Sequence, residues 1–165
     1  MKSCSHRVLR AATVSGEHGD GDNFRRALAR RGSEGKLPPG CETVMGDALD
    51  GSTYAAAVKG CSTFVHLVGV AHPSPAQSKQ FREIDLVAAR SAIQAAAQAS
   101  IEHFVYLNAA HPAPIMKTYI EVRSQAEQML RESGMNATIL RPWRVFWDRA
   151  IADRMLLFPS TGCSR

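Results

Sequence analysis

Cysteine and histidine could bind a metal ion, and cysteine could form disulfides, but their spacing in this sequence favours neither. The cysteines are scattered, with no Cys-x-x-Cys pair, at Cys4, Cys41, Cys61 and Cys163. We interpret them as reduced thiols. No His-x-x-x-His or His-Glu-x-x-His spacing occurs among the later histidines, which are His66, His72, His103 and His111. We therefore expect no metal site and place these histidines in loops and at strand ends.

The basic residues could indicate a nucleic-acid or phosphate partner, because the formal net charge is +5. Many of the positive charges lie in two stretches, residues 25–31 and 141–154, and neither resembles a nucleic-acid-binding module. A solvated basic surface is the simpler interpretation. We expect no nucleic-acid partner.

The size and composition are those of one globular domain. Of the 165 residues, 45% are hydrophobic and 21% are charged. No stretch approaches the roughly 20 apolar residues that cross a bilayer, and the polar start lacks a signal-peptide apolar region. We expect a cytoplasmic protein without a membrane partner. The pattern divides it into a divergent segment 1–34, an α/β domain 35–147 and a short tail or helix 148–165.

From Cys41 onward, short β-type runs alternate with longer helical runs, which is typical of βαβ units around a parallel sheet. The expected strands are residues 42–45, 63–71, 103–107 and 137–140. The expected helices are residues 52–59, 81–99 and 115–134. Ser52 is a candidate N-cap, and Gly60 and Gly134 are candidate helix stops. We predict that the last three strands are adjacent and parallel.

The first forty residues fit this alternation less well. Residues 7–14 form a weak strand candidate, and residues 15–22 are a polar turn. Only residues 23–31 remain for an element before the next loop. Their composition favours a helix with Asp22 as its cap.

Four segments, in this order, resemble the atypical short-chain dehydrogenases of the NAD(P)-dependent epimerase/dehydratase-like and NmrA-like groups. They are residues 35–50 with their Gly-Asp turn, Val65–Gly69, residues 103–109 and Ile139-Leu-Arg-Pro142, and they span about two-thirds of the chain. The resemblance implies a Rossmann-like, doubly wound parallel α/β sheet that is incomplete at its N-terminus. It also implies NADP or NAD as cofactor, lying across the carboxyl ends of the strands.

The resemblance also assigns cofactor-binding residues. Asp47 would accept a hydrogen bond from the adenine amino group, with Ala48 beside the ring. A turn-capping aspartate is an equally good interpretation of Asp47. Three residues would pass along the cofactor, namely Leu67, Val68 and Gly69, with glycine allowing close backbone approach.

The expected pyrophosphate cradle is altered. The run from Gly16 to Gly21 has glycines spaced G-x-x-G-x-G, but acidic residues beside them would repel phosphate. Two alignments remain open, since residues 24–31 match the second strand by resemblance and the first helix by propensity. In the strand alignment, Arg30 and Arg31 occupy the position where NADP-preferring members bind the 2′-phosphate. A solvated basic stretch is the alternative.

The catalytic signature is altered as well. Members of the family use a tyrosine with a lysine four residues later, because the ammonium lowers the phenol pKa. Here the pair is Tyr119 and Arg123, and Asn108 stands where a serine is usual. The resemblance implies Tyr119 as proton donor, with Arg123 as electrostatic and Asn108 as hydrogen-bonding support. Efficient family chemistry is not expected, because arginine is not a simple replacement for lysine.

Three interpretations therefore stay open: an NAD(P)-dependent oxidoreductase or epimerase acting on an unidentified small molecule, a non-catalytic NmrA-like binding or regulatory module, and a degenerate fragment of such an enzyme. If a dinucleotide binds, we expect weak affinity, because the pyrophosphate has lost its cradle.

Overall fold

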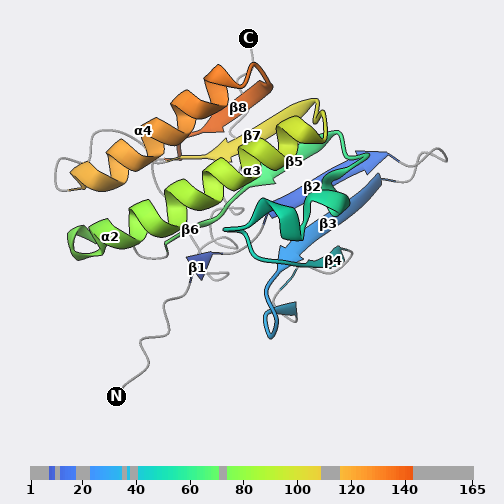
Figure 1. The fold of residues 1–165 in the computed structure, drawn as a ribbon, viewed down its shortest axis with the longest axis horizontal. Coiled ribbons are helices and arrows are strands. Elements are labelled where there is room, and N and C mark those ends of the chain that lie inside the picture. Colours follow the sequence, from blue (N-terminus) through green and yellow to red (C-terminus); the bar gives the residue numbers. More distant parts are fainter. Residues whose placement is uncertain are drawn as a thin grey trace, which may run out of the picture.

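The computed structural model describes residues 8–9, 12–17, 23–34, 37, 41–70, 74–108 and 116–142. Its centre is a six-stranded sheet with helices packed on one face (Figure 1). The strands of this sheet are β2 (Ala12–Glu17), β3 (Asn23–Ala29), β4 (Glu42–Met45), β5 (Thr63–His66), β7 (His103–Leu107) and β8 (Asn136–Leu140). Two short strands, β1 (Val8–Leu9) and β6 (Gly69–Val70), form a separate antiparallel pair. The predicted tail, residues 148–165, lies outside the described residues.

The strand order brings the carboxyl ends of five strands to one edge of the sheet. The order is β4-β3-β2-β5-β7-β8. β3 and β4 are parallel, and so are β5, β7 and β8. β2 runs antiparallel to both of its neighbours, β3 and β5, so these two strands are parallel to each other. We call the shared edge the carboxyl edge, and it is where an open α/β sheet binds its ligand.

The predicted Rossmann-like α/β class is confirmed, with one strand reversed. β5, β7 and β8 are adjacent and parallel, as their apolar runs predict. The first of them is shorter than expected, because the chain leaves the sheet after His66 and Gly69–Val70 pairs with β1 instead.

Helical segments fill the predicted positions. They are η2 (Gly51–Thr53), α1 (Ala55–Val58), η3 (Pro75–Gln77), α2 (Ser78–Gln80), the π-helical η4 (Phe81–Leu86), α3 (Val87–Gln98) and α4 (Lys117–Glu132). Gly60 and Gly134 follow their helices with φ of 76° and 69°, as C-terminal stops do. The N-cap of η2 is Asp50 and not Ser52, because the Asp50 carboxylate accepts from the Ser52 N–H.

One apolar core joins the helices to the sheet. Phe64 of β5 and Phe104 of β7 are fully buried, and their rings stack with centroids 5.2 Å apart. Small residues of α3 face them, including Ala92 and Ala96, which are buried. Because alanine adds little bulk, α3 lies close on the sheet, as its apolar stripe predicts.

The strand alignment of residues 23–31 is the correct one, and the helix predicted from propensity is wrong. β3 pairs with β2 on one side and β4 on the other, and these backbone bonds outweigh a weak helical preference. The side chains alternate accordingly, since Arg26 and Leu28 face α1 and the core while Ala27 points to the opposite face.

The first glycine of the glycine-rich run lies at the wrong edge for a cofactor cradle. Gly16 is inside β2 and pairs with Phe24 near the start of β3, so it lies at the edge opposite to the carboxyl edge. Gly19 and Gly21 lie outside the described residues. No described helix follows β2 before β3. The strand, turn and helix of a Rossmann pyrophosphate site are therefore not assembled here in the usual way.

Candidate functional site at the carboxyl edge

The end of β3 presents two arginines beside the end of β4. Arg30 and Arg31 follow β3 directly and are exposed. The Gly46 N–H donates to the Ala29 carbonyl over 3.1 Å, which holds the two strand ends together. The exposed Asp47 comes next. Two exposed arginines and one exposed aspartate thus follow the paired ends of β3 and β4 at the carboxyl edge.

Asp47 caps its own turn. Its Oδ1 accepts from the Leu49 N–H over 3.0 Å, and its backbone N–H donates to the Thr53 hydroxyl over 2.9 Å. The turn-capping interpretation therefore describes what Asp47 does in this structure. Gly46 precedes Asp47 in the same turn. A Cβ at residue 46 would come within 2.9 Å of both Leu28 Cδ1 and Thr53 Oγ1, so glycine fits this position best. Ala48 is half-buried against the core.

The predicted cofactor-lining residues after β5 are mostly enclosed by protein. Leu67 is half-buried, while Val68 and Gly69 are buried. The backbone of Gly69 pairs with Leu9 of β1. A Cβ at Gly69 would overlap Nη2 of Arg123, so only glycine leaves room for that guanidinium. Gly69 therefore allows the Arg123 guanidinium of this chain to come close to its backbone.

Arg123 is anchored from three directions. Its Nη2 donates to Asp85 Oδ2 over 3.1 Å, and its Nη1 donates to the Leu107 carbonyl over 2.9 Å. Nη1 also lies 3.4 Å from the Tyr106 hydroxyl. The other oxygen of Asp85 accepts from the Val70 N–H over 2.8 Å. This network joins α4, η4 and the ends of β6 and β7.

Burial makes this ion pair energetically demanding. The side chains of Asp85 and Arg123 are 1% and 7% exposed. Burial raises the pKa of Asp85, and the neighbouring guanidinium opposes that rise. For Arg123, burial works against the charged form, but Tyr106, Tyr119 and Asp85 hold its pKa above the ordinary value. The guanidinium stays protonated, and each charge depends on the other.

Asp85 was missed by the sequence reasoning, although a signal was present. It lies in the apolar stripe of the predicted helix, between Phe81 and Ala88, where a carboxylate needs a partner. The structure places it in the π-helical η4, a rare local geometry that is often found at functional sites. Its partner lies 38 residues away along the chain, beyond the reach of local spacing.

Tyr119 lies in the first turn of α4, on the same face as Arg123, as the spacing predicts. The ring packs edge-on against Phe81, with centroids 5.0 Å apart. The guanidinium carbon of Arg123 lies over the Tyr119 ring, 5.2 Å from its centroid. This contact is a cation–π interaction, so the charge acts on the face of the ring.

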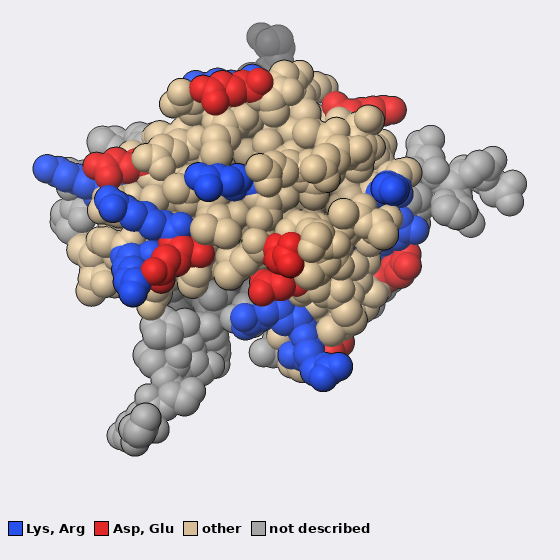
Figure 2. Space-filling model, viewed as in Figure 1, with Lys and Arg blue, Asp and Glu red and all other residues tan. Residues whose placement is uncertain are grey.

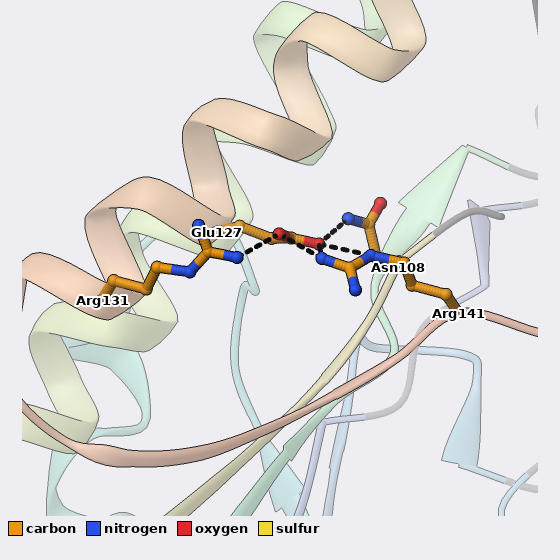
Figure 3. Close-up of polar contacts among 4 residues, drawn as sticks. All are labelled: Asn108, Glu127, Arg131 and Arg141. Carbon is orange, nitrogen blue, oxygen red and sulfur yellow. Dashed lines mark hydrogen bonds and ion pairs between the residues drawn. The ribbon is translucent and has the colours of Figure 1, made fainter. Parts of the chain in front are cut away.

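Asn108 turns toward α4. Its side-chain amide donates to Glu127, which is buried and also binds Arg141 and Arg131 (Figure 3). Arg141 makes the closer pair, with Nη2 2.6 Å from Glu127 Oε2, while Arg131 lies at 3.3 Å. The Asn108 N–H donates to the Leu140 carbonyl over 2.8 Å. This cluster fixes α4 to the ends of β7 and β8.

Glu127 was also missed, although it lies four residues after Arg123 on one helix face. The sequence places Arg141 in the Leu-Arg-Pro motif and in the basic stretch 141–154, without identifying a partner for it. In the structure the motif's arginine reaches back to α4 and binds Glu127 with both Nε and Nη2. The available signal was an acidic residue on the helix face of Arg123 together with the arginine of the motif, because carboxylate and guanidinium groups pair closely.

His66 is a buried polar residue at the end of β5. Its ring stacks on Tyr106 with centroids 5.6 Å apart, and neither ring nitrogen has a hydrogen-bond partner among the described residues. Burial, and secondarily the charge of Arg123, lower the pKa of His66 to about 3. The ring is therefore neutral near pH 7.

A small cavity opens beside Tyr119. Its volume is about 260 Å³, and its described lining consists of Pro75, Ser78, Phe81, Met116, Lys117, Thr118 and Tyr119. That volume is close to the lower end of ligand pockets, about 300 Å³. A small polar molecule would meet hydroxyls, one ammonium and two aromatic rings there.

The helix-covered face carries mixed charge. Figure 2 shows basic and acidic side chains interspersed among uncharged ones on this face. Over the described part of the chain, no group of three or more histidine, cysteine, aspartate or glutamate residues is arranged to hold a metal ion. His72 and His111 lie outside the described residues. None of the described helices is both long and apolar enough to cross a bilayer.

The sheet topology defines a Rossmann-like α/β domain. Residues 17–154 match the protein family described as NAD(P)H-binding. Since this match covers most of the chain, the chain belongs to the NAD(P)H-binding family. The resemblance to epimerase-like short-chain dehydrogenases and the assignment of NAD or NADP as the cofactor class are thereby confirmed.

A curated relative and solved structures are consistent with this family. The protein described as an uncharacterized sugar epimerase, YhfK, from Bacillus subtilis (strain 168) is 35% identical over 132 residues, covering 73% of this chain and 60% of that protein. The oxidoreductase ylbE from Lactococcus lactis has a TM-score of 0.58 at 20% identity, over 70% of this chain and 56% of that one. Bordetella bronchiseptica WbmH, in complex with NAD+, has a TM-score of 0.55 at 19% identity, over 69% of this chain and 46% of that one. The chain thus spans about three-fifths or less of these proteins.

The residues present fit one end of the cofactor better than the other. Arg30, Arg31 and Asp47 are exposed at the carboxyl edge, where an adenosine group with its phosphate can reach them. Around Gly69 the space is filled by Arg123. The described residues form no glycine-turn cradle for the pyrophosphate, because β2 is reversed.

Proposed function

We propose that this chain is the dinucleotide-binding part of an NAD(P)-dependent oxidoreductase or epimerase whose substrate is a small sugar-like molecule. The single observation that carries the proposal is the carboxyl edge of five parallel strands in a chain of the NAD(P)H-binding family. The name of the relative, a sugar epimerase, supports the substrate class.

The adenosine end of the cofactor would lie at the ends of β3 and β4. Arg30 and Arg31 would bind the 2′-phosphate of NADP, because two guanidinium groups suit a phosphate dianion. Asp47 would accept from the adenine amino group through the oxygen that does not cap its turn. Leu67, Val68 and Gly69 would border the cofactor beyond the adenosine, and Ala48 would pack beneath the ring.

The reacting end would lie near the cavity beside Tyr119. When bound, the dinucleotide supplies the hydride acceptor or donor. Tyr119 would exchange a proton with a substrate hydroxyl held in the cavity, with Arg123 contributing positive charge and Asn108 holding the end of β7 against α4. These roles account for why an ionisable phenol borders the cavity.

Calorimetric titration with NADPH and NADH tests the proposal. We expect binding of at least one of them, with a dissociation constant weaker than about 1 μM, or about 8 kcal/mol, because the pyrophosphate lacks its usual cradle. Turnover assays with sugars and sugar nucleotides should then show a slow activity that Tyr119→Phe abolishes while cofactor affinity stays within about two-fold. Absence of binding by either nucleotide at millimolar concentration would contradict the proposal.

A further inference from the structure

The space over Gly69 is taken by a side chain of this chain. Nη2 of Arg123 lies where a side chain at residue 69 would begin. Asp85, 3.1 Å away, keeps it there, and Asp85 is itself held by the Val70 N–H. Both charges are buried, so moving one without the other would leave an uncompensated charge. The ion pair therefore holds the guanidinium in the space over Gly69.

Both outer nitrogens of Arg123 already donate to groups of this chain. Nη1 donates to the Leu107 carbonyl and lies near the Tyr106 hydroxyl, and Nη2 donates to Asp85. Nε is buried, without a hydrogen-bond partner among the described residues. A ribose that approached the ends of β5 and β7 would therefore meet a guanidinium engaged with protein on both of its outer nitrogens.

The two ends of the carboxyl edge differ in how exposed their residues are. At the ends of β3 and β4, Arg30, Arg31 and Asp47 are exposed. At the ends of β5 and β7, Gly69 and Arg123 are buried, and β1 pairs with the Gly69 backbone. A dinucleotide laid across this edge with its adenosine over β3 and β4 would have its nicotinamide half over β5 and β7.

We infer that the Asp85–Arg123 ion pair is a latch that closes the nicotinamide side of the site, so that this chain holds a dinucleotide by its adenosine end unless the latch opens. This inference rests on the proposed function. It identifies adenosine phosphates as the ligand class that the closed site recognises. It also explains a Tyr-x-x-x-Arg spacing whose arginine binds an aspartate of the same chain.

Calorimetric titrations that compare each dinucleotide with its adenosine half distinguish binding at the two ends of the carboxyl edge. Adenosine 2′,5′-bisphosphate is NADP without its nicotinamide mononucleotide half, and AMP has the same relation to NAD. For the wild-type chain we expect the dissociation constants of NADPH and adenosine 2′,5′-bisphosphate to agree within about three-fold. If the chain prefers NAD, the same should hold for NADH and AMP. Nicotinamide mononucleotide alone should not bind.

Opening the latch should restore a contribution from the nicotinamide half. Arg123→Lys keeps a cation for Asp85 but removes the guanidinium from the space over Gly69. In this variant the dinucleotide should bind at least ten-fold more tightly than its adenosine half. The pair Asp85→Asn with Arg123→Leu removes both charges together and should give the same gain if Arg123→Lys folds poorly. Arg90→Lys, on the exposed side of α3, is the matched control and should behave as wild type.

Each outcome bears on a different claim. Binding of the whole dinucleotide ten-fold or more tightly than its adenosine half in the wild-type chain would overturn the latch and leave the proposed function standing. Equal affinities in the wild-type chain and in both latch variants would also overturn the latch. If no nucleotide binds in any form, the proposed function fails and the latch with it.

Discussion

Nη2 of Arg123 lies 3.1 Å from Oδ2 of Asp85, and the two side chains are 7% and 1% exposed. A helix residue four positions after Tyr119 is thus paired with a carboxylate from the π-helical segment of a different βα unit. The pair connects the helices to the ends of β6 and β7, because Val70 and Leu107 complete its hydrogen bonds.

Removing one member of this pair should destabilise the fold strongly. Arg123→Ala leaves Asp85 buried without its counter-charge, which costs about 3–5 kcal/mol of unfolding free energy. Asp85→Asn combined with Arg123→Leu should cost much less, because no charge is left unpaired. Urea denaturation followed by circular dichroism measures both. Equal losses in the single and double variants would show that the two charges are not coupled.

A methyl group at residue 69 should disturb the same pair. Gly69→Ala would overlap Nη2 of Arg123, so the guanidinium must shift, at a cost of about 1–3 kcal/mol. In Arg123→Lys the guanidinium is gone, and the same substitution should cost less. Denaturation of the four proteins of this double-mutant cycle measures the difference. If Gly69→Ala costs the same in both backgrounds, the two residues are not in contact.

Much of the sheet can be predicted from local pattern, for a physical reason. β5 and β7 are rich in the β-branched and aromatic residues that favour strands, and they stand out in the sequence for that reason. The helix behind them is equally visible, since Ala88 and Ala92 recur on one face against the sheet.

Strand direction and distant pairs could not be predicted in this way. Nothing local to Ala12–Glu17 indicates that β2 runs antiparallel, because its direction depends on pairing with both β3 and β5. For β3, helix propensity was misleading, since inter-strand bonds determined the outcome. The partners of Arg123 and Asn108 lie on other elements, so spacing revealed their helix or strand but not their contacts.

Glu127 should matter more to stability than the exposed arginine that also contacts it. Glu127→Ala leaves the buried Asn108 amide and Arg141 without their acceptor, at a cost of about 3 kcal/mol. Arg131→Ala removes a partner that is 68% exposed and should cost less than about 1 kcal/mol. Thermal and urea denaturation compare the two variants. Similar losses would mean that Glu127 contributes only through its surface pair.

The arginines after β3 should determine the preference between NADP and NAD. Arg30→Ala with Arg31→Ala removes the proposed 2′-phosphate partners, so affinity for NADPH should fall about ten-fold or more while affinity for NADH stays within about three-fold. Arg25→Ala is the control, because Arg25 is exposed on the same strand but pairs with Ser15 toward the opposite edge. Isothermal titration provides the constants. A parallel fall for both nucleotides would place the arginines away from the 2′-phosphate.

His66 should make the fold sensitive to mild acid. Its pKa is lowered from 6.5 to about 3, so the folded state favours the neutral ring; this contribution is intact above pH 6.5 and is lost as pH falls toward 3. At pH 5 the loss is about 2 kcal/mol, from 1.36 kcal/mol per pKa unit. His66→Phe keeps an aromatic ring against Tyr106 and removes the titration, so its unfolding free energy should fall by about 2 kcal/mol less between pH 7 and pH 5. His103→Gln, on the neighbouring strand, should retain the wild-type acid loss. Urea denaturation across this pH range measures the three proteins, and an unchanged slope in His66→Phe would mean that the ring is already charged or solvated in the folded chain.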